Sequence, residues 1–143
     1  MNIKKLSTLL VVLTLSLAAM AQSKIYFCDD VTEAGKPVGH STTKAIIYPE
    51  DGGSLYVLYS TDKPIKEKQF NVKVELKNAK GVYEVVENTK VDTEVNQKWF
   101  TFDIMLEKIG EYKITVQTLA KVDLATAMVK ATEAVEEADD SDE

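Results

Sequence analysis

The stretch KWFTFDIML, residues 98–106, decides the fold together with GEYKITV, residues 110–116, which follows after a short polar corner. Apolar and polar residues alternate in both segments, and this alternation places every second side chain of a strand on the same face. The inward set begins at Phe100 in the first segment and at Tyr112 in the second. The pattern predicts two strands joined by a tight corner, with the rest of the chain forming sheet that packs onto them.

The remaining chain also consists of short apolar segments separated by turns. Residues 70–77 show the clearest alternation, and a turn that ends in Gly81 leads back into residues 82–87, which predicts a hairpin. Further strands are predicted at residues 23–28, 42–48 and 55–59. Strands at this density, without a helical interval, predict an all-β antiparallel sandwich of about seven to nine strands.

The segment 121–131 fits two interpretations. As a helix, it would be capped by Asp123 and would carry Leu124 and Met128 on one face. As a strand, it would alternate apolar and polar residues with period two. We favour the strand, because the strand at residues 110–116 would otherwise lack a partner on one side.

The run GEYKITV resembles the Gly-x-Tyr-x-apolar-x-apolar segment that opens the penultimate strand of many bacterial immunoglobulin-like, PKD-like and fibronectin-like domains. The resemblance implies an immunoglobulin-like sandwich in which Gly110 opens the strand and Tyr112 forms a tyrosine corner, its hydroxyl bonding back to nearby backbone. The antibody-type cysteine pair is missing, and Trp99 does not lie between two cysteines, so no antigen-type binding mode is implied. The resemblance implies a fold and no particular activity, because this fold hosts many functions.

The sequence divides into three regions. Residues 1–21 combine a basic start, an apolar run and a small-residue end at Ala21, which is the pattern of a secretory signal peptide. The apolar run is shorter than the roughly 20 residues that a membrane-spanning helix needs. Residues 22–132 would form the sandwich domain, and residues 133–143 an acidic disordered tail that holds seven of the 23 acidic residues and no base. We therefore expect export to the periplasm or the cell exterior, with no membrane span in the mature chain.

Charge and cysteine content exclude some functions. All 17 basic residues are lysine and they are outnumbered by 23 acids, so the chain lacks the concentrated basic face that nucleic-acid binding requires. A single cysteine cannot form an internal disulfide, so the hydrophobic core alone must hold the domain together.

Cys28 and His40 are the residues that would suggest nucleophilic catalysis. A Cys–His pair can generate a reactive thiolate, so a small exported hydrolase or redox protein is one alternative function. However, Cys28 ends an apolar segment, where cysteine usually serves as a small buried side chain. No phosphate loop, nucleophile elbow or metal-spaced histidine set occurs in the sequence. We expect no catalytic residues and no enzymatic activity.

Calcium is the metal that the loop carboxylates would suit best, because it prefers oxygen ligands. Asp29 and Asp30 follow the first predicted strand, and Glu50 and Asp51 lie in a turn. Neither pair has the spacing of an EF-hand loop, so solvated loop acids are the favoured interpretation. We expect no cofactor, with calcium as the alternative.

Aromatic side chains are the remaining binding candidates, and we single out Trp99 and Tyr56. The preferred interpretation is a secreted, non-catalytic immunoglobulin-like module that binds a protein or a glycan of unknown identity. A structural or stress-related envelope protein is the further alternative.

Overall fold

The computed structural model describes three parts of the chain: residues 23–39, 44–47 and 52–133. The expected signal peptide, residues 1–21, lies outside the described residues, as does all of the expected tail except Glu133. His40, Glu50 and Asp51 also lie outside them.

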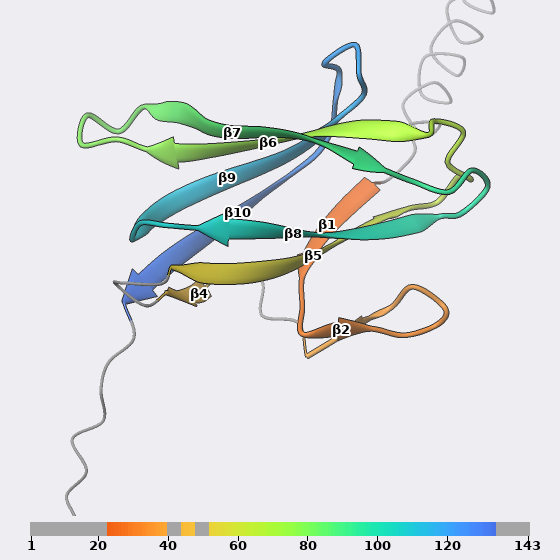
Figure 1. The fold of residues 1–143 in the computed structure, drawn as a ribbon, viewed down its shortest axis with the longest axis horizontal. Helices are drawn as coiled ribbons and strands as arrows, with labels where there is room; N and C mark the ends of the chain where they lie inside the picture. Colours follow the sequence, from red (N-terminus) through yellow and green to blue (C-terminus); the bar gives the residue numbers. More distant parts are fainter. Residues whose placement is uncertain (1–22, 40–43, 48–51, 134–143) are drawn as a thin grey trace, which may run out of the picture.

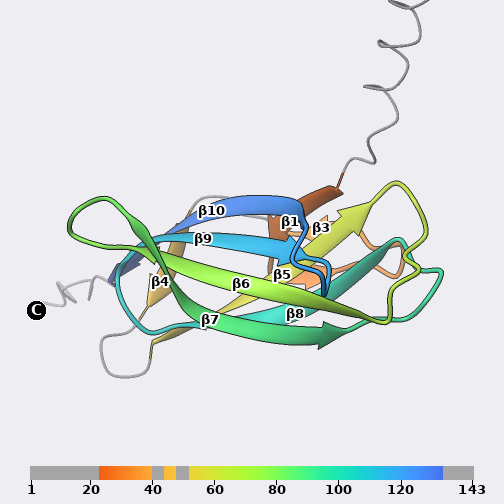
Figure 2. The ribbon, with the colours of Figure 1, turned by 90° about the horizontal axis from the view of Figure 1, so that it is seen from above.

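The described residues contain ten strands: β1 (Ser23–Phe27), β2 (Asp30–Val31), β3 (Pro37–Val38), β4 (Lys44–Ile47), β5 (Gly53–Thr61), β6 (Gln69–Lys77), β7 (Tyr83–Asp92), β8 (Trp99–Leu106), β9 (Gly110–Gln117) and β10 (Asp123–Glu133). One sheet has the order β1-β5-β8, a second has the order β4-β10-β9-β6-β7, and β2 and β3 form a separate hairpin. Neighbouring strands are antiparallel, except that β4 and β10 are parallel. Figures 1 and 2 show the two larger sheets facing each other, so the predicted all-β sandwich is confirmed.

The order of the strands is that of the immunoglobulin fold. In that fold strands A, B and E share one sheet, while G, F, C and C′ share the other. Here β1, β5 and β8 take the places of A, B and E, and β10, β9, β6 and β7 take those of G, F, C and C′. The six residues between β7 and β8 leave no room for a strand D, so β8 forms the edge of its sheet.

Alternating side chains of both sheets form the core. The ring centroids of Tyr59 on β5 and Phe100 on β8 lie 4.8 Å apart, and Phe70 on β6 stacks on Phe100 from the opposite sheet at 5.2 Å. Aromatic pairs at such distances add stabilisation beyond the area they bury. On β9, Ile114 and Val116 are fully buried. The period-two pattern therefore predicted the inward faces correctly.

Residues 98–116, which include the two segments that decide the fold, pass from one sheet to the other. β8 and β9 are consecutive in the chain but lie in different sheets, so the corner between them is a crossover. The hydroxyl of Tyr112 donates to the carbonyl of Lys108 at 2.7 Å and accepts from the backbone N–H of Lys108 at 3.2 Å. Gly110 has a φ of 145°, and a Cβ there would lie 2.9 Å from Leu76 Cδ1. The crossing thus needs both a tyrosine and a glycine.

The uncertain segment 121–131 is a strand. β10 pairs with β9 along nearly its whole length, with a bulge between Asp123 and Ala125. Val129 and Ala131 contribute to the core. The strand interpretation is therefore confirmed for the reason that favoured it, because β10 covers the side of β9 that β6 leaves open.

Three hairpin turns share one backbone geometry: residues 32–36, 78–82 and 118–122. In each turn the first and fifth residues are joined by a backbone hydrogen bond, and the N–H of the fourth donates to the carbonyl of the first. The fourth residue is left-handed in all three, with φ of 76° at Gly35, 81° at Gly81 and 64° at Lys121. A side chain in this region costs about 1–2 kcal/mol. The β9–β10 turn therefore carries strain that the other two avoid.

Replacing the residues at this position should move stability in opposite directions. We expect Lys121→Gly to raise the free energy of unfolding by about 1 kcal/mol, and Gly81→Lys to lower it by about 1–2 kcal/mol. The space at Gly81 is open, since a Cβ there meets only Lys77 Cε at 3.8 Å, so the cost reflects backbone conformation alone. Urea unfolding of both variants measures the effect. Equal stability of Lys121→Gly and the unchanged protein would contradict the assignment of strain.

Tyr112 should also make the fold sensitive to alkali. Burial raises the pKa of Tyr112 above its ordinary value of 10.0, and burial likewise raises the pKa of Tyr59. Between pH 10 and these raised values the folded state holds more protons than the unfolded state at these two residues. The stability that they contribute is therefore constant below about pH 10 and falls above it. Tyr112→Phe should lose about 1 kcal/mol at pH 7 and decline less steeply in alkali. Urea unfolding from pH 7 to pH 11 tests this, and parallel pH profiles for the two proteins would refute it.

Candidate functional site

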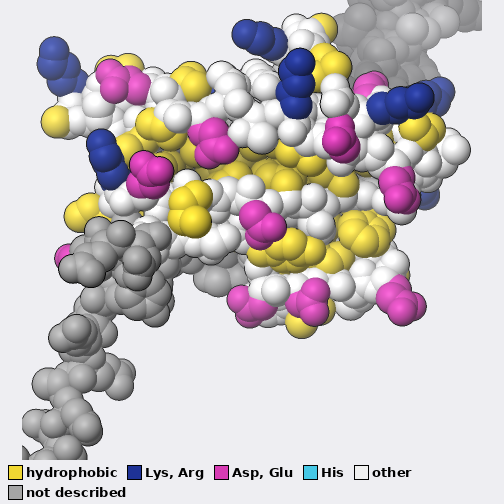
Figure 3. All heavy atoms as spheres, viewed as in Figure 1, with side chains coloured by type: hydrophobic (Ala, Val, Ile, Leu, Met, Phe, Trp, Pro, Cys, Tyr) yellow, Lys and Arg dark blue, Asp and Glu magenta, His cyan; other side chains and the backbone are white. Residues whose placement is uncertain are grey.

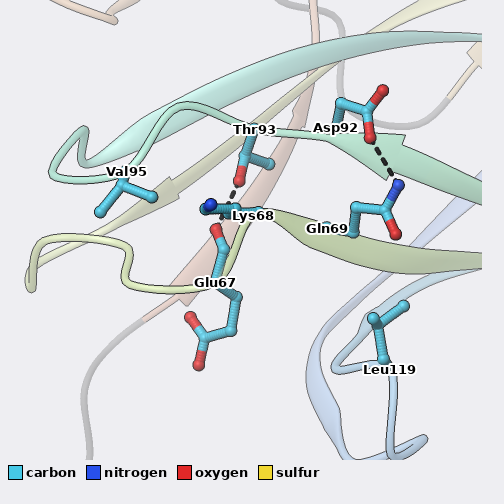
Figure 4. A pocket seen from close by; sticks show the side chains of 7 residues that line it. All are labelled: Glu67, Lys68, Gln69, Asp92, Thr93, Val95 and Leu119. Carbon is cyan, nitrogen blue, oxygen red and sulfur yellow. Dashed lines mark hydrogen bonds between the residues drawn. The ribbon is translucent and has the colours of Figure 1, made fainter.

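A pocket lies at one end of the five-stranded sheet, where three loops meet. It has a volume of about 710 Å³. The β5–β6 loop, the β7–β8 loop and the β9–β10 turn meet there with the adjoining ends of β6 and β7, as Figure 4 shows; the lining residues are Glu67, Lys68, Gln69, Asp92, Thr93, Val95 and Leu119. This is the end at which immunoglobulin-like domains cluster the B–C and F–G loops, and loops on a rigid sandwich commonly carry binding residues.

Hydrogen bonds between the first two loops hold the polar wall of this loop-end pocket in place. Gln69 Nε2 donates to Asp92 Oδ1 at 2.7 Å. Thr93 donates from its hydroxyl to the carbonyl of Glu67 at 2.7 Å, and from its backbone N–H to the carbonyl of Lys68 at 2.8 Å. Figure 4 shows the first two of these bonds. The wall is therefore ordered before any ligand arrives, which reduces the entropy lost on binding.

The apolar wall of the pocket is exposed. Leu119 is 51% exposed and Val95 is 41% exposed, and they come from different loops. In the two other turns of the same geometry the position of Leu119 is held by Glu33 and Ala79. The β9–β10 turn thus differs from its counterparts at two positions, since it presents a large apolar side chain and it keeps Lys121 where glycine is unstrained. A strained residue beside an exposed apolar one is the pattern expected of a binding loop.

Polar and apolar groups together limit what the pocket can do. The lining includes the carboxylates of Glu67 in a loop and Asp92 at the end of β7, together with one ammonium group, an amide, a hydroxyl and two aliphatic side chains. None of the seven lining residues is a cysteine or a histidine. The arrangement is suited to binding a ligand with both hydrogen-bonding groups and an apolar side chain.

Trp99 and Tyr56, the two predicted binding residues, lie elsewhere, on the outer face of the three-stranded sheet. Trp99 is half-buried, because its indole packs on Gly35 in the β2–β3 turn. Between the two aromatics Leu58 is fully buried, although it also faces outward from the sheet. The β2–β3 hairpin therefore covers this part of the sheet and leaves less of Trp99 open than a free outer face would.

Only two of the four predicted calcium ligands, Asp29 and Asp30, lie among the described residues. Asp29 is exposed and its carboxylate lies against Gly39, while the carboxylate of Asp30 accepts the N–H of Val31 at 2.8 Å. Glu50 and Asp51 lie outside the described residues. No group of three or more potential metal ligands comes together among the residues that are described. The calcium alternative stays a prediction.

Cys28 is placed as a buried side chain. It is 7% exposed, and its backbone N–H donates to the carbonyl of Tyr56 at 3.1 Å. Burial raises the pKa of the Cys28 thiol, and the neighbouring carboxylates of Asp29 and Asp30 raise it further. A raised pKa disfavours the thiolate that nucleophilic or redox chemistry would use.

A charged cluster lies on the outer face of the five-stranded sheet. Glu75 is 9% exposed, and its carboxylate lies 3.6 Å from Lys113 Nζ and 4.0 Å from Lys73 Nζ. Lys113 also sits over the ring of Tyr83 at 4.7 Å. One carboxylate is thus shared by two ammonium groups, and we interpret the cluster as part of the scaffold.

The loop-end pocket was not predicted from the sequence. Its residues are spread over three loops, so nothing in their spacing brings them together. One signal was present, because the turn TLAKV at residues 118–122 lacks the glycine of TEAGK at 32–36 and NAKGV at 78–82. Aligning the three turns would have identified Leu119 and Lys121 as exceptions.

The packing of Trp99 on the hairpin leads to a spectroscopic prediction. A Cβ added at Gly35 would lie 2.1 Å from Trp99 Cδ1, and the φ of 76° already disfavours a side chain. Gly35→Ala should therefore displace the hairpin and hydrate the indole. Trp99 is the only tryptophan, so its fluorescence emission should shift to the red while the far-ultraviolet circular dichroism of the sandwich is kept. Gly81→Ala, which meets no close neighbour, serves as the control. An unchanged emission spectrum for Gly35→Ala would be inconsistent with the contact.

The part of the chain that the structure describes offers no helix with the length and apolar character needed to cross a membrane. No known protein family matches the sequence, and no curated protein does. Among solved structures, the chain is similar to an immunoglobulin-like protein from Pseudomonas aeruginosa, with 13% identity over 80% of this chain and 99% of that chain and a TM-score of 0.45.

A chitin-binding domain from Burkholderia pseudomallei has 12% identity over 64% of this chain and 57% of that chain, with a TM-score of 0.42. A CARDB domain from Pyrococcus furiosus, solved in complex with di-metal ions, has 18% identity over 80% and 94%, with a TM-score of 0.38. These likenesses are too distant to transfer a ligand. The immunoglobulin-like fold of this chain follows from its own strand order and its tyrosine corner.

Proposed function

We propose that this chain is an exported, non-catalytic binding module that holds a segment of a partner protein in the loop-end pocket. The observation that carries the proposal is the departure of the β9–β10 turn from its two counterparts. Leu119 is 51% exposed at the tip of this turn and lines the pocket. An exposed leucine over an ordered polar wall is suited to an amphipathic protein segment, whose apolar side chain it contacts while the backbone bonds to the wall.

A protein ligand fits the lining better than a glycan does. The seven lining residues include no aromatic ring on which a sugar could stack, and their apolar part is aliphatic. Catalysis by Cys28 is disfavoured as well, since its buried thiol has a raised pKa and it directly follows β1, which belongs to the other sheet. Export is supported by the signal-peptide pattern of residues 1–21.

Substitution of Leu119 should remove binding and leave the fold intact. We expect Leu119→Asp to weaken partner binding by about tenfold or more, because it removes the apolar contact and adds a charge beside Glu67 and Asp92. The matched control is Ala79→Asp, which adds the same charge at the equivalent position of the turn at the opposite end of the sheet.

The full chain, immobilised, is exposed to an envelope extract of the producing cells, and bound proteins are identified. The affinity of each is then measured for the unchanged protein and for both variants. Loss of binding in Leu119→Asp alone supports the proposal. A partner that binds all three proteins equally would place the site elsewhere. Binding of isolated cell-surface polysaccharide that depends on Leu119, with no protein partner, would assign the pocket to a glycan.

A further inference from the structure

We propose that two copies of this chain pair edge to edge through β8 and form one continuous six-stranded sheet. The proposal is independent of the loop-end pocket and begins from the free edge of the three-stranded sheet. Among the described residues β8 pairs with β5 on one side, and no strand pairs with its other side. A free edge is a row of unpaired backbone donors and acceptors, which is a template for another strand.

The register shows which residues of β8 carry these free groups. Thr61 donates its N–H to the carbonyl of Lys98 at 2.9 Å, and this pair continues the register of β5 with β8. In an antiparallel pair the inward-bonded residues alternate with outward-bonded ones. The backbone groups of Phe100 and Phe102 therefore point toward β5. Those of Trp99, Thr101, Asp103 and Met105 point away from the sheet.

β8 lacks the features that protect other edges from pairing. β7, at the edge of the larger sheet, carries four charged residues, Glu84, Glu87, Lys90 and Asp92, and its pairing with β6 contains a bulge. Charges and bulges are common protections of edge strands. By contrast, β8 pairs with β5 without a register shift and has Asp103 as its only charged residue. It contains neither proline nor glycine.

Part of the surface beside this edge is apolar. A cleft of about 410 Å³ lies between the edges of the two sheets. Its lining combines Leu76, Val86 and Met105 with Glu87, Glu107, Lys108 and Tyr112. Met105 is 52% exposed and Val86 is 55% exposed. Figure 3 shows the corresponding apolar band along the molecule, in the view in which Figure 1 places β7 and β8 on either side of it. A strand added to β8 would remove part of this surface from water.

A second copy is the occupant that the sequence of β8 fits. An antiparallel pair centred on Phe102 matches every outward-bonded residue with an outward-bonded residue of the second copy. Trp99 then lies beside Met105 of the second copy, where sulfur–aromatic contact is favourable. Thr101 lies beside Asp103 of the second copy, a neutral residue opposite an acid. Shifting the pair by one step to centre it on Asp103 would place two carboxylates opposite each other, which is destabilising.

Two pairs of variants test the interface and its register by sedimentation equilibrium of the full chain, as the expressing cell processes it. Asp103→Pro removes an outward-pointing N–H, which a proline on an edge strand does not need, so the monomer should keep its fold. It should raise the dimer dissociation constant at least tenfold, while Asp103→Ala should leave dimerisation largely intact. Circular dichroism and the melting temperature confirm that each variant is folded.

Thr101 tests the register without depending on proline. Thr101→Asp would place like charges opposite each other at two symmetric positions and should weaken the dimer about tenfold. Thr101→Lys would place opposite charges there and should dimerise as well as the unchanged protein or better. A monomeric unchanged protein, whatever else it binds, overturns the proposal. So does a dimer that folded Asp103→Pro leaves unaffected, or a dimer equally stable in both Thr101 variants.

Discussion

The hydroxyl of Tyr112 bridges the point at which the chain leaves one sheet and enters the other, and the rest of the sandwich depends on that crossing. The hydroxyl bonds to both the carbonyl and the N–H of Lys108. These polar backbone groups of the corner are therefore paired by a residue of the strand that follows it. With the corner fixed, the inward faces of β8 and β9 oppose each other across the core, where Phe100 meets Phe70. Because the chain has one cysteine and no possible internal disulfide, this packing must hold the sheets together.

Local sequence patterns predicted the features that depend on neighbouring residues in the chain, namely the buried faces of the strands and the corner between β8 and β9. The alternation of residues 70–77 and 98–106 identified their buried faces, and the run around Tyr112 identified the corner that links the sheets. The last strand was predicted by a pairing argument, since a strand such as β9 needs a partner on each side. The extent of burial on the outer faces was not predictable in this way. Leu58 is fully buried on a nominally outer face, and no periodicity reports such burial.

The candidate site was missed for a related reason. The sequence indicated the aromatic residues Trp99 and Tyr56 as binding candidates, and in the structure the indole of Trp99 packs on Gly35. The pocket instead combines loop residues whose proximity depends on which strands are neighbours, a long-range property. Of the segments that line the pocket, only the β9–β10 turn has a sequence that could have indicated the site. It became visible by comparison with two turns of the same geometry, which show what Leu119 and Lys121 replace.

The placement of strain and exposure follows from how this small sandwich is stabilised. A left-handed lysine costs about 1–2 kcal/mol, a considerable part of the 5–15 kcal/mol by which domains are typically stable. Such a cost is tolerated at a turn, where no core contact depends on it, whereas the same cost at Gly110 would disturb the crossing itself, since a Cβ there would also contact Leu76. Function in this chain is therefore expected at the loop ends and the sheet edge. At both places the sequence departs from what stability or solubility alone would favour, with Lys121 in place of glycine and an apolar β8 in place of a protected edge.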